Sequence, residues 1–144
     1  MLIEKIIGKK PADTGSKIIE TVSYEWFEAN NKIIKRKSSN KTDIGLRLKE
    51  PLFDGALLYE DENKIIYLEL LPCELTRLQV RDAKEMGRIC FELGNRHLPI
   101  SIGEMSVSTP YDKPTFEYLQ KLGFSCARET EKFIPEIIVY GHSH

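Results

Sequence analysis

Long hydrophobic runs are absent from the sequence: no uninterrupted apolar stretch among its 144 residues exceeds four, as at residues 65–68. A membrane-spanning helix needs about 20 such residues, and the core of a secretory signal needs at least about seven. We therefore expect a soluble, cytoplasmic protein with no membrane partner. Excess charge is also lacking, since the net charge at pH 7 is −1. No basic platform for nucleic acid is expected.

Cysteine is scarce. Cys73, Cys90 and Cys126 are widely spaced and form no C-x-x-C pair, which argues against a disulfide framework and a zinc knuckle. We expect reduced thiols. Cys90 falls on the apolar stripe of a predicted helix and Cys126 in a predicted strand, where packing is favoured over thiolate chemistry. The sequence contains no H-E-x-x-H or H-x-x-E-H helix, so a metal-dependent hydrolase is not expected, and the protein is predicted not to be an enzyme.

The first half of the chain reads as a series of short strands. Apolar and polar residues alternate with a period of two, so one face of each strand can be buried. Asn, Asp and Ser cluster between the strands and favour tight reversals. This pattern predicts an N-terminal all-β sandwich or barrel over residues 1–74, which contacts a partner or acts as a scaffold. The expected strands are 2–7, 18–26, 33–37, 43–48, 56–59 and 64–70.

The pattern changes near residues 71–74, where Pro72 interrupts the last strand and a helical period follows. A second domain is predicted over residues 75–133, beginning with a strand at 75–80. Asp82 should cap the next helix, with Glu85 completing a capping box. We expect Gly94 to end that helix in a left-handed conformation.

The remaining segments complete a recognisable order of elements. Residues 99–102 and 105–108 are typical of a hairpin, a second helix should run from near Asp112 to Gly123, and residues 124–133 should form a last strand. The order β-α-β-β-α-β predicts a ferredoxin-like plait. The fold class is therefore α+β, with an N-terminal all-β domain followed by a C-terminal ferredoxin-like domain. Residues 134–144 are predicted to be a flexible tail.

The three histidines are the candidate metal ligands: His97 follows the first predicted helix, and His142 and His144 nearly end the chain. Neutral imidazole is a common ligand of nickel, copper and zinc. A lone loop histidine is more often a surface residue, and the tail histidines could be ordinary solvated residues or the remnant of an affinity tag. However, eleven residues beyond Phe133 reach up to about 35 Å when extended, so the tail could fold back to help assemble a site.

One stretch carries a family resemblance. Gly94-Asn95-Arg96-His97, together with Glu-Met-Gly at 85–87, Tyr-Asp-Lys-Pro at 111–114 and the ending Tyr-Gly-His-Ser-His at 140–144, resembles the UreE family of urease accessory proteins. Residues 42–48 and 54–59 are similar to the N-terminal domain of that family. The resemblance implies a nickel metallochaperone.

The resemblance also implies an assembly. It predicts a homodimer in which the histidine matching His97 comes from each of two chains to one Ni(II) ion on the two-fold axis. The N-terminal domain should be similar to the peptide-binding domain of Hsp40-type chaperones, and the C-terminal domain should dimerise. The implied partners are apo-urease and the urease accessory GTPase. Zn(II) and Cu(II) can compete for such ligands, so nickel is chosen on the resemblance and not on the ligand set.

The chain departs from some relatives, because it lacks a long His-rich tail and has Tyr111 and Lys113 where some members carry histidines. Storage of many ions and a secondary metal site are therefore not expected. The alternative hypothesis is a metal-free interaction module or an RNA-binding ferredoxin-like protein. Such a protein would not need the C-terminal histidines, and the sequence has no RNP-like aromatic stretch that would favour RNA.

Overall fold

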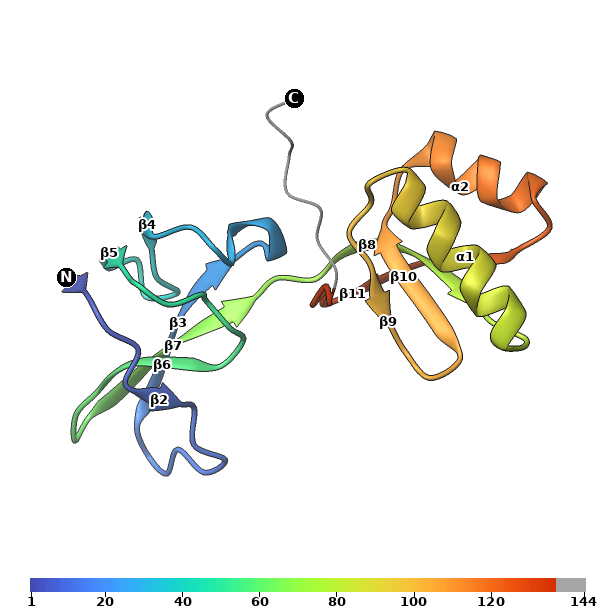
Figure 1. Ribbon diagram of the computed structural model, residues 1–144. Helices are drawn as coiled ribbons and strands as arrows, with labels where there is room; N and C mark the ends of the chain where they lie inside the picture. Colours follow the sequence, from blue (N-terminus) through green and yellow to red (C-terminus); the bar gives the residue numbers. More distant parts are fainter. Residues whose placement is uncertain (137–144) are drawn as a thin grey trace. The chain divides into compact units, whose positions relative to one another are not determined.

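The computed structural model describes residues 1–136, while residues 137–144 lie outside the described part. The chain divides into two compact units, Met1–Leu71 and a second unit that begins at Pro72. The first unit is built from strands, and the second carries both α-helices of the described chain (Figure 1). The prediction of a mixed α+β protein is confirmed. No helix within residues 1–136 is both long enough and apolar enough to cross a bilayer.

The first unit contains two sheets. One has the strand order β1-β5-β4 and the other the order β2-β6-β7-β3. Most neighbours are antiparallel, but β1 runs parallel to β5 and β3 runs parallel to β7. The strands are β1 (Leu2–Ile3), β2 (Gly8–Lys9), β3 (Ile18–Tyr24), β4 (Ile33–Lys37), β5 (Asp43–Arg47), β6 (Ala56–Glu60) and β7 (Lys64–Leu70).

Both sheets contribute to one core, because alternate side chains of each strand point to the same side. Val22 and Tyr24 from β3 are buried in the same cluster as Ile44 and Leu46 from β5. The strand expected at residues 2–7 is shorter than predicted: β1 ends at Ile3, and the next strand, β2, begins at Gly8 in the other sheet.

The strand expected at residues 18–26 ends early, at Tyr24, and a 3-10 turn follows, η1 (Trp26–Glu28). The turn is stabilised by the side chain of Glu28, which accepts a hydrogen bond from the Glu25 amide at 2.9 Å. Arg36 holds the same carboxylate through an ion pair of 2.6 Å. The hydrogen bond from Arg36 lowers the pKa of Glu28 below its ordinary value. The ion pair between Glu28 and Arg36 of β4 thus stabilises the turn that follows β3. The alternation of apolar and polar residues at 18–26 did not indicate this contact.

The outer edge of β3 is covered by the turn between β4 and β5. Ser39 donates its amide to the carbonyl of Thr21 at 2.9 Å, and its hydroxyl accepts the amide of Thr21 at 2.9 Å. Close by, Ile18 and Ile19 are exposed. Ser39 therefore fills the backbone hydrogen-bonding positions at the middle of this strand edge, and Arg36 donates to the Ser23 carbonyl further along it at 2.8 Å.

The buried Tyr24 side chain should make the stability of the first unit fall at alkaline pH. Burial, with a smaller contribution from the Asp54 carboxylate, raises the pKa of Tyr24 to about 12, against about 10 in an unfolded chain. The folded protein keeps a proton that the unfolded chain loses, so the stabilisation is present in full below pH 10 and is lost as the pH rises through 12. We expect Tyr24→Phe to remove a stability loss on the order of 2 kcal/mol from this window. Urea unfolding at pH 9 to 12 measures the free energy of unfolding of both proteins. If that free energy fell with pH as steeply in Tyr24→Phe as in the natural protein, Tyr24 would not be the group responsible.

The second unit contains one antiparallel sheet with the strand order β11-β8-β10-β9. The helices pack on one face: Leu78 and Val107 of the sheet share a core with Ile89, Leu93 and Leu119 of the helices. The elements, in chain order, are β8 (Cys73–Gln79), α1 (Ala83–Asn95), β9 (Ser101–Ile102), β10 (Ser106–Pro110), α2 (Lys113–Lys121) and β11 (Ser125–Glu131).

Several strand ends in this unit differ from those expected. The strand β8 begins at Cys73, two residues before the expected start, and the two units meet before Pro72. The last strand was expected to reach Phe133 but ends at Glu131. Glu131 pairs with Cys73, the first residue of β8, so the ladder has no further partner. Strand β10 runs to Pro110 and not only to residue 108.

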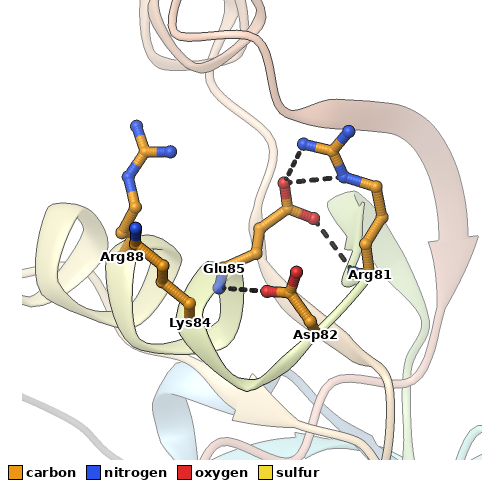
Figure 2. A pocket seen from close by; sticks show the side chains of 5 residues that line it. All are labelled: Arg81, Asp82, Lys84, Glu85 and Arg88. Atoms are coloured by element: carbon orange, nitrogen blue, oxygen red, sulfur yellow. Dashed lines mark hydrogen bonds and ion pairs between the residues drawn. The ribbon is translucent and has the colours of Figure 1, made fainter.

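The predicted start of α1 is confirmed, but half of its capping box is displaced. Asp82 accepts the Glu85 amide at 2.8 Å, as expected. The Glu85 carboxylate, however, accepts the amide of Arg81 at 3.0 Å and not that of Asp82, and also binds the Arg81 guanidinium (Figure 2). These hydrogen bonds lower the pKa of Glu85. Lys84 and Arg88 also line this pocket of about 160 Å³. The contacts among Arg81, Asp82 and Glu85 fix the first turn of α1.

Candidate metal centre

The end of α1 carries His97 in an unusual conformation. The helix does not stop at Gly94, as the sequence predicted, but continues to Asn95, with Arg96 as its C-cap. His97 then has a positive φ of 59°. The His97 amide donates to the carbonyl of Gly94 at 2.9 Å, and the Leu98 amide donates to that of Leu93 at 3.1 Å. These two bonds form a Schellman motif, in which the left-handed residue is usually glycine.

The loop after His97 is held by hydrogen bonds to distant parts of the unit. The hydroxyl of Thr109, on β10, donates to the Pro99 carbonyl at 2.8 Å. The amide of Glu136 donates to the Ile100 carbonyl at 2.9 Å. Together with the Schellman bonds, these contacts fix most of the backbone from 97 to 100. His97 is therefore presented by a well-determined loop.

The residue before His97 is also placed by a contact. The guanidinium of Arg96 lies over the ring of Tyr118 on α2, 3.9 Å from its centroid. The Tyr118 hydroxyl donates to the carboxylate of Glu92 at 3.2 Å. Arg96 thus makes a cation–π contact that joins the end of α1 to α2.

The side chain of His97 is exposed. A left-handed backbone costs a residue with a Cβ atom roughly 1–2 kcal/mol, although histidine tolerates it better than most. The fold would be satisfied by glycine at this position. A histidine here points to a use for the imidazole, because an exposed ring on a fixed loop lies where an ion from outside the unit could reach it.

This reading predicts that His97→Gly stabilises the metal-free protein. Glycine relieves the left-handed strain but loses more entropy on folding, so we expect a net gain of about 0.5–1 kcal/mol in the free energy of unfolding. His97→Ala keeps the strain and serves as the matched control, with little change from the natural residue. Urea unfolding at one fixed protein concentration compares the three proteins. If glycine were no better than alanine, the backbone at residue 97 would not be strained.

The other two candidate ligands, His142 and His144, lie outside the described residues. Among residues 1–136, no group of three or more His, Cys, Asp or Glu side chains is arranged to hold a metal ion. The last described residue, Glu136, is nevertheless bonded to Ile100, three residues from His97. His142 lies six positions beyond Glu136, a reach of up to about 20 Å. The chain length therefore allows the tail histidines to meet His97.

Cys90 and Cys126 are unsuitable ligands. Cys90 and Cys126 pack against the core of this unit, as the sequence predicted. Burial raises the pKa of both thiols, and only the thiolate binds metal ions well. Sequence reasoning missed Thr109, Tyr118 and Glu136, which position the loop. Their contacts join elements that are far apart in the sequence, and no local pattern indicated them.

Comparisons with known proteins identify the same family that the residues around His97 resemble. Residues 74–144 match the family model described as the C-terminal domain of the UreE urease accessory protein. The chain is 32% identical over 149 residues to the urease accessory protein UreE of Acetivibrio thermocellus, covering 100% of this chain and 97% of the relative. It is 36% identical over 133 residues to UreE of Helicobacter pylori strain Shi470, covering 85% and 76%.

A further relative is longer than this chain. UreE of Bifidobacterium longum subsp. infantis is 37% identical over 126 residues, which cover 86% of this chain but 57% of that protein. The similarity to the A. thermocellus protein, in contrast, extends over nearly the full length of both chains.

Proposed function

The chain belongs to the family of UreE urease accessory proteins, and on that premise we propose that it is a nickel metallochaperone that delivers Ni(II) to apo-urease. Membership makes it an accessory chaperone of urease maturation and not an enzyme. Nickel is its cargo. The observation that carries the proposal is the exposed His97 imidazole, held in a left-handed conformation on a fixed loop.

One histidine per chain cannot enclose an ion, so the proposed site is shared by two chains of a homodimer. A two-fold axis brings identical loops together and turns one His97 into two ligands. His142 and His144 are proposed to complete the shell from the tails. Imidazole and oxygen ligands suit Ni(II), and a delivery protein benefits from an open site that can release its ion. Cu(II) and Zn(II) are expected to compete for the same ligands.

The outer face of α1 supports dimerisation near His97. Phe91 is 68% exposed, and on the same face Gly87 and Gly94 lie four residues before and three residues after it. A Cβ atom at either glycine would meet nothing within 4 Å. A glycine inside a helix costs up to about 1 kcal/mol relative to alanine. In a two-fold dimer, Phe91 of each chain could fill the space above Gly87 or Gly94 of its partner. This face of α1 is therefore suited to contact a second copy of itself.

We propose the ferredoxin-like plait for the second unit and an Hsp40-like peptide-binding role for the first. The strand order β11-β8-β10-β9 and the sequence of elements support the former. The two sheets that share one core support a sandwich in the first unit. The second unit would bind nickel and dimerise, and the first would contact partners. The proposed partners are apo-urease and its accessory GTPase, in the cytoplasm.

Titration of nickel into the metal-free protein by calorimetry, with the mass measured in parallel, tests this function. We expect one tight nickel ion per two chains and the mass of a dimer. X-ray absorption should report imidazole nitrogen around the ion. If the protein bound no nickel tightly, or bound one ion per monomer, the shared-site proposal would be wrong. If no nickel bound tightly, a metal-free interaction module would be the better interpretation.

A further inference from the structure

Positive charge is concentrated in one hairpin of the first unit. Strands β4 and β5 pair in antiparallel fashion and lie side by side (Figure 1). Residues 32–50, which contain both strands, include seven Lys or Arg residues and two acidic residues, a net charge of +5. The rest of the chain has 14 basic and 20 acidic residues, a net charge of −6. The chain is nearly neutral overall, but its charge is unevenly distributed.

Most cations of this hairpin have no carboxylate partner in the described part of the chain. The ion pairs of the first unit are Lys17–Glu60, Arg36–Glu28, Lys37–Asp43 and Lys64–Glu20. Five exposed cations of the hairpin take no part in these pairs: Lys32, Lys35, Lys41, Arg47 and Lys49. Of the two carboxylates of the hairpin, Asp43 is held by Lys37, and Glu50 accepts the Ile6 amide at 3.2 Å. The excess positive charge therefore faces solvent.

Strand alternation places several of these side chains on one face of the sheet. Ile34, Ile44 and Leu46 point into the core of the unit, so the residues between them point outward. On one side of β5, Leu2 of β1 lies beside Gly45. On the other side, the outward pairs are Ile33 with Arg47, Lys35 with Gly45, and Lys37 with Asp43. These seven outward residues are here called the outer face.

The outer face combines positive charge with exposed aliphatic groups. Ile33 is 65% exposed and Leu2 is 58% exposed. Gly45 adds no side chain at the centre, where a Cβ atom would lie 3.6 Å from Cδ1 of Leu2. Lys35 and Arg47 are diagonal neighbours in the register, about 7–8 Å apart. An exposed aliphatic side chain is stabilised when a partner covers it with an apolar group, so the face fits a ligand that is both acidic and apolar.

The dimensions of the outer face fit an extended protein segment. In an extended strand, every second side chain points to the same side, with about 6.8 Å between successive ones. A segment that presents glutamate and leucine alternately on that side would meet cations and aliphatic groups in turn. The five residues of β4 span only about 17 Å. The small size of the face and the net charge of −6 on the rest of the chain disfavour a long polyanion such as RNA and an anionic membrane.

We propose that the outer face docks an acidic, partly apolar segment of a protein partner. Lys35 and Arg47 pair with carboxylates of that segment, and Ile33 and Leu2 cover its apolar side chains. The inference rests on the proposed function, in which the first unit contacts partners, and gives that contact a surface and a chemistry. Electrostatic attraction of this kind is screened by salt. Binding should therefore weaken as the ionic strength rises.

Peptide binding to the full-length protein tests the proposal. The probe is a short labelled peptide in which every second residue is alternately glutamate and leucine, with serine between them. Fluorescence anisotropy measures its affinity at about 0.1 M salt, where distant charges are largely screened. We expect Lys35→Glu combined with Arg47→Glu to weaken binding by at least about tenfold. Lys9→Glu combined with Lys84→Glu makes the same change of net charge at two other exposed positions, and should leave the affinity within about twofold.

Two further comparisons distinguish docking from general attraction between charges. A peptide with lysine in place of glutamate should bind the charge-reversed protein more tightly than the natural one. Ile33→Ser, which leaves the charge unchanged, should weaken binding of the glutamate peptide about threefold. Ile18, on β3, is 60% exposed, so Ile18→Ser is the matched control and should have no effect. If the charge-reversed protein fails to fold, Lys35→Gln combined with Arg47→Gln replaces it.

Several outcomes would overturn the inference. They are an absence of peptide binding, and equal affinity of the natural and charge-reversed proteins for the glutamate peptide. Tighter binding of poly(U) RNA or of phosphatidylglycerol vesicles through the same two cations would also contradict it, as would a change of mass that assigns the face to a second copy of the chain. Nickel titration keeps the function separate, because the charge-reversed protein should bind nickel like the natural one. If the natural protein bound no nickel, the nickel function would fail while the peptide result still decided the docking surface.

Discussion

Replacing His97 by alanine is expected to lower nickel affinity by at least about 100-fold, which corresponds to about 2.7 kcal/mol of binding free energy. In a shared site one substitution removes two ligands, because both chains carry it. The tail histidines alone lack a fixed point of attachment. The fold should persist, since the side chain of His97 is exposed. Calorimetric titration of the metal-free mutant measures the loss, and circular dichroism checks the fold.

Asn95→Ala is the control for this substitution, because Asn95 is also exposed and lies two residues from His97. It should leave the affinity within a few-fold of the natural protein. His97→Gly, which is expected to be more stable than the natural protein, should lose nickel binding as completely as His97→Ala. If either His97 mutant kept one tight nickel ion per dimer, the ligand assignment would be wrong.

The second large effect is expected at the outer face of α1. Phe91→Asp should convert the dimer to a monomer and lower nickel affinity by about 100-fold or more. A charged side chain would be buried without a partner on each side of the interface, a change that costs several kcal/mol in total. The shared site would disappear with the second chain. Sedimentation or native mass measurement, with and without nickel, reports the assembly.

Phe27→Asp provides a closely matched control. Phe27 is 65% exposed and belongs to the first unit, while Phe91 is 68% exposed and belongs to the second. The two variants therefore make the same chemical change at similar exposure. Only Phe91→Asp should alter the mass and the nickel affinity. A dimer that survives Phe91→Asp would exclude this face of α1 from the interface.

Helix starts were the most predictable features of the second unit. Asp82 caps α1 as expected, and α2 begins next to Asp112 as expected, where Asp112 is the cap. A capping side chain bonds to an amide three residues away. Gly123, with a φ of +90°, follows α2 as predicted. Each of these features depends on residues within a single turn, so local sequence carries the information.

The end of α1 could not be predicted in the same way. The sequence offered Gly94 as the stop, yet the left-handed residue is His97. The deciding contacts involve Leu98, which packs on the same core as Leu93, and Thr109, which fixes Pro99 from another strand. Tertiary packing therefore overrides the local preference for glycine. The mismatch occurs at the residue singled out as a metal ligand.

The proposed ligands were chosen from the sequence alone, whereas the contacts that hold the His97 loop could not be. His97 stands out because the sequence has so few histidines. The contact of Arg96 with Tyr118 depends on how α2 packs beside α1. The hydrogen bond from Glu136 to Ile100 depends on how residues 132–136 return to the start of β9. Such returns are set by the sheet order, which no single segment encodes.

The covered edge of β3 should limit aggregation of this protein at high concentration. Isoleucines at 18 and 19 would make an open strand edge prone to recruit strands from other copies and grow into aggregates. Because Ser39 already holds both backbone groups of Thr21, an incoming strand would find no continuous ladder to extend. A chaperone must be abundant enough to meet its client without associating with itself through unintended contacts. One serine in a turn serves that need in the first unit, far in sequence from the residues proposed to bind the cargo.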